Sequence, residues 1–126
     1  MNKQHFIDTI QFFSIREIKA VGTDIRDVDS LVLENLNRLR RILNRPILIT
    51  SLTNGVHAPK SLHYIGKAVD CVIDGIHPNR VLETALDVGF RGIGLYSTHW
   101  HFDVRDGGVK LWKGQTIKPM VERRID

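Results

Sequence analysis

One segment of this sequence, Asp27 to Asn44, places the strongest constraint on the fold. Its apolar residues recur at steps of three and four, which puts them on one face of an amphipathic helix. These residues are Val28, Leu31, Val32, Leu36, Leu39 and Leu43. Pro46 predicts that the helix has ended by Arg45, because a proline disfavours helical geometry in the residue before it. The arginines of this segment are expected to lie on its solvated face.

The other apolar segments are short and are separated by turn residues. A capping box from Ser14 to Glu17 predicts a short helix over about 15–20, and a further helix is predicted from about 78 to 88. Strands are predicted at 47–50, 68–73, 93–96 and 100–105, with a loop over 51–63. The turn at 106–108 predicts a hairpin between the last strand and residues 109–112. This order indicates an α+β domain with a small mixed or antiparallel sheet flanked by helices.

The length of 126 residues indicates a single domain spanning 1–126, because two domains would each be too small to bury an adequate core. No apolar run is long enough for a transmembrane helix. Asp8, Thr9 and Gln11 interrupt the stretch in which a signal peptide would need apolar residues, so we expect synthesis in the cytoplasm. The single cysteine, Cys71, excludes an internal disulfide. We expect a monomer.

The net charge of +4 is mildly basic. A surplus of this size favours the approach to a polyanion such as a bacterial cell wall. It does not predict a nucleic-acid partner, because nucleic-acid binding would explain none of the histidine and aspartate positions described next.

Two places break the pattern of apolar strands. Asp70 lies inside one predicted strand, and an ionised carboxylate buried there needs a compensating cation. His63 precedes Asp70 in the adjoining loop. The second place is the strand around His99, His101 and Asp103, whose side chains share one face because a strand has a period of two. The residues that alternate with these, Trp100 and Phe102, are expected to pack in the core, as is Cys71 beside Asp70.

Imidazoles and carboxylates from these two strands suit Zn²⁺, and three protein ligands with an open fourth position are typical of catalytic zinc. A water molecule in that position becomes acidic enough to act as a nucleophile near neutral pH. Judged by spacing alone, the same side chains also fit a set of satisfied polar contacts. His77, which precedes Pro78, is interpreted as a residue that begins a helix.

One string of this sequence is Ser61-x-His63-x-x-Gly66-x-Ala68-x-Asp70. It resembles the first zinc motif of the D-alanyl-D-alanine carboxypeptidase family of zinc peptidases. The family includes vancomycin-resistance D,D-dipeptidases and phage L-alanyl-D-glutamate endolysins, and its fold is related to the hedgehog signalling domain. Its second motif is similar to a later block, Gly92-x-Gly94 followed by His101-x-Asp103-x-Arg105 and Trp112.

The resemblance covers about residues 12–113 and implies a hedgehog-like zinc peptidase fold. It implies that His63, Asp70 and His101 hold Zn²⁺. It also implies hydrolysis of an amide bond in peptidoglycan peptides, by carboxypeptidase or endopeptidase action. A short chain of this type is expected to act on the cell wall, in phage lysis or as part of a virion.

Two departures from the family bear on the active site. Many relatives carry an arginine directly after the strand that is predicted here at 47–50, where it binds the substrate carboxylate or orients the water. This chain has no arginine there. Lys60 or Arg105 is the candidate to replace it, and His57 is expected to line the cleft. Many relatives also place an acid or a histidine three residues before the last ligand, where this chain has Thr98.

A threonine hydroxyl cannot act as a base near neutral pH, so another side chain must move the proton. His99 is our first candidate for the base or transition-state stabiliser, because an imidazole titrates near neutrality. Asp103 is the alternative base, or it orients an imidazole through a hydrogen bond. The same departures leave a second interpretation, a zinc-binding domain that no longer catalyses and serves as a wall-binding or structural module.

Overall fold

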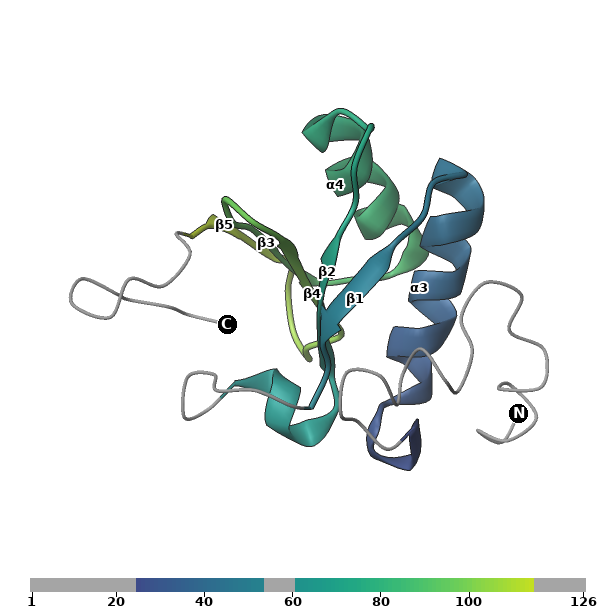
Figure 1. The fold of residues 1–126 in the computed structure, drawn as a ribbon. Coiled ribbons are helices and arrows are strands. Elements are labelled where there is room, and N and C mark those ends of the chain that lie inside the picture. The colour runs from purple at the N-terminus through teal and green to yellow at the C-terminus, as the bar shows by residue number, and fades with distance from the viewer. Residues whose placement is uncertain (1–24, 54–60, 115–126) are drawn as a thin grey trace.

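The computed structural model describes residues 25–53 and 61–114 of the chain (Figure 1). A five-stranded mixed sheet and two helices make up this part, which confirms the predicted α+β class. The helices are α3 (Ser30–Leu43) and α4 (Pro78–Val88), and the strands are β1 (Leu48–Ser51), β2 (Ala68–Val72), β3 (Gly92–Leu95), β4 (Trp100–Asp103) and β5 (Lys110–Lys113). Two short 3-10 helices, η1 (Ile25–Asp27) and η2 (Leu62–Ile65), complete it. The helix predicted at 15–20, with its capping box from Ser14 to Glu17, lies outside the described residues.

Both helices begin and end at residues suited to those positions. Asp29 caps α3 by accepting a hydrogen bond of 2.9 Å from the backbone of the first turn, so this helix begins later than the periodicity indicated. The imidazole of His77 caps α4 in the same way, at 3.1 Å, which confirms its predicted place at a helix start. Gly89 ends α4 in the left-handed conformation, with φ at 117°.

The strand order across the sheet is β1-β2-β4-β3-β5. Adjacent strands are antiparallel except for β3 and β5, which run parallel. The predicted hairpin between β4 and β5 is therefore wrong. Both edges of β4 are already occupied, by β2 and β3. β5 therefore cannot pair with β4 and pairs with the outer edge of β3 instead. The turn at 106–108 reverses the chain as predicted. The strand that follows then lies along the far edge of β3 and pairs with β3.

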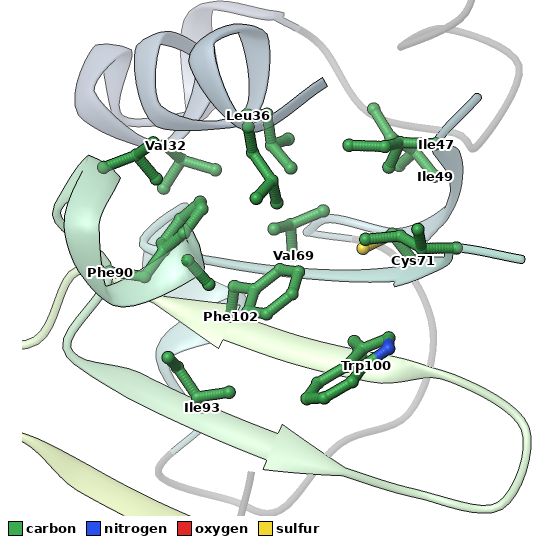
Figure 2. Packing of buried hydrophobic residues seen from close by; sticks show 14 of the residues in the cluster. Val32, Leu36, Ile47, Ile49, Val69, Cys71, Phe90, Ile93, Trp100 and Phe102 are labelled. Atoms are coloured by element: carbon green, nitrogen blue, oxygen red, sulfur yellow. The ribbon is translucent and has the colours of Figure 1, made fainter. Parts of the chain in front are cut away.

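One face of the sheet forms the hydrophobic core with α3 and α4. Figure 2 shows Val69, Cys71, Trp100 and Phe102 packed on this face beneath the helix that carries Leu36. The prediction that Cys71, Trp100 and Phe102 lie in the core is confirmed. Because side chains alternate along a strand, Asp70, His101 and Asp103 must face the opposite side. The core thus fixes which residues of β2 and β4 are presented for chemistry.

Candidate metal centre

Asp70 and His101 are brought together by the register of the sheet. The two residues are direct partners across the antiparallel pair of β2 and β4. Directly opposed side chains in such a pair lie within reach of one another. Nδ1 of His101 lies 3.3 Å from Oδ1 of Asp70. Both side chains are buried, although they lie on the side of the sheet away from the helices.

His63 reaches the same place from η2, a turn that the sequence had predicted as plain loop. Ser61 caps this turn by accepting a hydrogen bond from the backbone of His63, and Gly66 ends it with φ at 74°. A Cβ at position 66 would lie 1.9 Å from the carbonyl oxygen of Asp27, so only glycine fits. Ser61 and Gly66 of the first motif therefore shape the turn that places His63 beside Asp70.

Three ligand atoms converge at this point. Nε2 of His63 lies 3.0 Å from Oδ1 of Asp70 and 3.3 Å from Nδ1 of His101. Around a tetrahedral zinc ion with bonds of about 2.0–2.1 Å, neighbouring ligand atoms lie about 3.3 Å apart. The three separations thus match one face of such a tetrahedron. Within residues 25–53 and 61–114, His63, Asp70 and His101 form a buried group that can hold a metal ion.

Hydrogen bonds on the far side of each ring orient the two imidazoles. Nδ1 of His63 lies 2.7 Å from the carbonyl oxygen of Leu52, which can only accept a hydrogen bond. Nε2 of His101 lies 2.7 Å from Oδ2 of Asp103. With these outer nitrogens engaged, each ring turns its other nitrogen toward Asp70, where it can offer a lone pair to a metal ion. In the metal-free protein a proton at this point lets an imidazole donate to Asp70, and a bound metal ion would take the place of that proton.

The charge of Asp70 is set by the two histidines. Burial disfavours the ionised carboxylate, but hydrogen bonds and attraction from His101 and His63 outweigh burial and hold the pKa of Asp70 well below its usual range. An ionised carboxylate beside two imidazole lone pairs is the donor set that zinc accepts. The side chains present therefore fit the metal that the motif resemblance implies.

Asp103 and Arg105 form a pair behind His101. Asp103 is fully buried, and Arg105 donates to its carboxylate through Nε at 2.9 Å and Nη2 at 2.6 Å. Burial opposes the ionisation of Asp103, but the hydrogen bonds from Arg105 and His101 hold the pKa of its carboxyl well below the usual range. The strand predicted to reach residue 105 ends at Asp103, where the chain turns so that Arg105 binds back onto it.

His99 lies at the edge of the metal centre. Its Nε2 is 3.8 Å from Oδ2 of Asp70, and its ring stacks on Tyr96 with centroids 4.6 Å apart. On its other side, Nδ1 lies 3.0 Å from the hydroxyl of Thr98. Trp112 donates to the hydroxyl of Tyr96 at 2.8 Å. The sequence placed His99 near the ligands, whereas the support from Thr98 and Tyr96 was not foreseen.

A polar hollow of about 160 Å³ adjoins His99. Its lining includes Asp74, Ser97 and Thr98. A larger cavity of about 410 Å³ is mostly apolar and lies on the helix side of the sheet, between α4 and β5. The metal centre faces the other side of the sheet, and the smaller hollow is linked to it through His99.

Not every residue singled out from the sequence lies in the described part. His57 and Lys60 fall outside it, so their predicted contact with the substrate stays a prediction. Arg105 lies next to the centre, bound to Asp103. The carbonyl of Leu52 was missed, because every residue has a carbonyl and no side-chain signal distinguishes this one.

Comparison with known proteins adds no identification: no protein-family model, curated protein or solved structure matches this chain. In the described ranges, neither helix has the length and apolar character needed to cross a membrane.

Proposed function

We propose that this protein is a zinc-dependent peptidase that hydrolyses an amide bond in bacterial peptidoglycan peptides. The observation that carries the proposal is the convergence of His63 Nε2, Asp70 Oδ1 and His101 Nδ1, each 3.0–3.3 Å from the others. Nitrogen and carboxylate donors in a set of three are typical of catalytic zinc sites. A bound zinc ion supplies an acidified water nucleophile and a Lewis acid for the carbonyl group.

His99 is the residue best placed to handle the proton. Its Nε2 faces the ligand carboxylate of Asp70, and its ring lines the polar hollow. Thr98 and the stacked ring of Tyr96 hold the imidazole in this orientation. A base must lie within hydrogen-bond reach of the proton that it accepts, and Nε2 of His99, beside Asp70, is the atom that we assign to this task.

Asp103 is less suited to act as the base. Both of its carboxylate oxygens already accept hydrogen bonds, from His101 and Arg105. A carboxylate whose lone pairs are engaged in this way is a poor proton acceptor, and its lowered pKa points the same way. We therefore assign Asp103 the alternative role of orienting His101.

The substrate class rests on the two motifs that resemble the D-alanyl-D-alanine carboxypeptidase family. The structure explains why several residues of these motifs are present. Ser61 and Gly66 shape the turn that carries His63, and Asp103 orients His101. A substrate of this kind would place the protein's action at the cell wall, in phage lysis or in a virion. The mild positive charge favours approach to anionic wall polymers.

A second candidate function is a zinc-binding module without catalysis. The sequence favours it at two points: the arginine that relatives carry after the strand corresponding to β1 is absent, and Thr98 stands where many relatives have an acid or a histidine. The two candidates predict the same metal centre and differ only in hydrolysis.

The test combines metal analysis with digestion of purified cell walls and defined muropeptides, followed by mass spectrometry. We expect one zinc ion per chain and release of defined peptide fragments. His63→Ala should abolish both, whereas His77→Asn should abolish neither, because His77 only caps α4 and asparagine is also a good cap. Zinc binding without cleavage of any muropeptide would overturn the peptidase and favour the binding module.

A further inference from the structure

We propose that Arg105 is a positioning residue of the metal centre: by clamping Asp103 it makes His101 present Nδ1, rather than Nε2, to the metal. The inference rests on the metal centre proposed above but not on peptidase activity. The sequence suggested that Arg105 binds the substrate, and the inference gives this residue a different task.

The contacts form a chain from Arg105 to the metal ligands. Arg105 donates to Oδ1 of Asp103 through Nε and through its own backbone N–H, at 2.9 and 3.1 Å, and to Oδ2 through Nη2 at 2.6 Å. Oδ2 also accepts from Nε2 of His101 at 2.7 Å. This two-pronged contact fixes the plane of the carboxylate, and the carboxylate in turn fixes the rotation and the protonated nitrogen of His101.

The surroundings of Asp103 make the arginine necessary. Asp103 is fully buried, and a buried carboxylate without a cationic partner is costly. His101 cannot be that partner while it serves as a neutral metal ligand. Arg105 is the cation bound directly to this carboxylate, and its own pKa is raised by the hydrogen bond to Asp103. Lysine would supply the charge but not the planar, two-pronged geometry.

Two glycines of β3 make room for this clamp. A Cβ at Gly92 would lie 2.2–2.4 Å from the carboxylate atoms of Asp103, so a side chain there would displace the carboxylate. A Cβ at Gly94 would lie 2.5 Å from the indole of Trp112. That indole packs 5.1 Å from the ring of His101 and lies 5.2 Å beneath the guanidinium of Arg105. The Gly-x-Gly pattern is thus explained by the packing of the clamp.

The test compares the zinc affinity of Arg105→Gln and Arg105→Lys with that of the unaltered protein, by competition with a chromophoric chelator. Residues that only orient a metal ligand typically change affinity about 10–100-fold, and we expect a loss of that size for Arg105→Gln. Arg105→Lys should recover only part of it. Arg91→Gln is the matched control, since the side chain of Arg91 donates to Gly107 in the loop between β4 and β5. Arg91 contacts Asp103 only through a backbone hydrogen bond, which the substitution leaves in place. An equal loss in Arg91→Gln would overturn the inference in favour of a general effect on the loop.

A double-mutant cycle tests whether Arg105 acts through Asp103. In the Asp103→Asn background, Arg105→Gln should lower zinc affinity by less than about threefold, because the clamp is already lost. Full additivity of the two losses would overturn the inference. The metal-free protein gives an independent readout, the ¹⁵N NMR shifts of the His101 ring above its usual pKa. Arg105→Gln should reduce the population protonated at Nε2, and an unchanged population would also overturn the inference.

The same experiments separate this inference from the proposed function. If the unaltered protein binds no zinc, the metal centre of the proposed function fails, and the inference fails with it whatever the NMR shifts show. If zinc binds but walls are not cleaved, the peptidase fails while the role of Arg105 is still decided by affinity and NMR. Circular dichroism of each variant shows whether the fold is retained.

Discussion

Asp70 on β2 and His101 on β4 are direct partners in the antiparallel ladder, and Asp70 Oδ1 lies 3.3 Å from His101 Nδ1. The pair is fixed by backbone hydrogen bonding and not by side-chain choice. The neighbours of both residues on the same strands, Cys71 and Phe102 among them, are anchored in the core. A slip of one residue in either strand would bury the ligands among apolar side chains and expose the core, so the register that stabilises the fold also assembles the centre.

The first prediction concerns the ligands. Asp70→Asn keeps the shape of the side chain but removes its charge, and it should weaken zinc binding by more than about 100-fold, because loss of a residue that merely orients a ligand already costs 10–100-fold. His63→Ala and His101→Ala should have a comparable effect. Competition with a chelator measures the affinity, and His77→Asn serves as the control. Full retention of zinc by Asp70→Asn would remove Asp70 from the centre.

The sequence was sufficient to predict much of the fold and part of the site. The apolar periodicity located α3 and α4, because amphipathic helices that cover a sheet leave a direct trace in the sequence. The alternation around Asp70 and His101 predicted which side chains share a face away from the core. Cys71 could be assigned to the core by the same argument, and it lies there.

The remainder depends on contacts that sequence patterns do not encode. The parallel place of β5 follows from the occupied edges of β4, which is a property of the whole sheet. The Leu52 carbonyl that orients His63 is a backbone atom just after the end of β1, eleven residues before the ring that it contacts. In the sequence, Arg105 looked like a cation available to a substrate, and its hydrogen bonds to Asp103 could not be read there. In each case the partner became visible only in three dimensions.

The second prediction concerns the removal of metal. The core between the sheet and the helices contains no ligand side chain, so we expect the protein to stay folded after treatment with a chelator. Zinc binds only the folded state, and at 100 times its dissociation constant such a ligand stabilises by about 2.7 kcal/mol. Thermal unfolding followed by circular dichroism should therefore show a lower Tm in the chelated sample. Loss of most secondary structure at room temperature would contradict this and indicate a structural zinc site.

The third prediction concerns Cys71. Burial of its thiol, aided by the nearby charge of Asp70, raises the pKa of Cys71 well above the usual value of 9.0. Above that pH the unfolded chain loses the thiol proton while the folded chain keeps it. Ionisation then favours the unfolded state, so the contribution to stability is complete below pH 9 and is lost as the pH rises further.

The measurement for Cys71 is urea unfolding of the metal-free protein across this pH range. One proton changes the free energy of unfolding by at most about 1.4 kcal/mol per pH unit. Cys71→Ala should be less stable at every pH because it leaves a cavity, but its stability should fall less steeply above pH 9. Equal slopes for the two proteins would show that the thiol ionises alike in both states.

The last prediction concerns His99 and Thr98. If His99 moves the proton in the proposed hydrolysis, His99→Ala should lose about 10²–10⁴-fold in the rate of muropeptide cleavage, the usual size of general acid–base catalysis. It should keep its zinc, because His63, Asp70 and His101 hold the metal. Thr98 only orients the ring, through the 3.0 Å contact between its hydroxyl and Nδ1. Thr98→Val should therefore lose far less activity, and Thr98→Ser should restore it.

The matched pair at position 98 makes the prediction specific, because valine and serine differ in the hydroxyl that contacts His99. A loss in Thr98→Ser equal to that in Thr98→Val would show that the hydroxyl alone does not account for the role of Thr98. If His99→Ala loses its zinc, His99 is itself a ligand and the assignment of three ligands needs revision. If it keeps both zinc and full activity, the proton is moved elsewhere. Asp103→Asn would then be the next variant to assay, since it removes the charge while preserving the shape of the other candidate base.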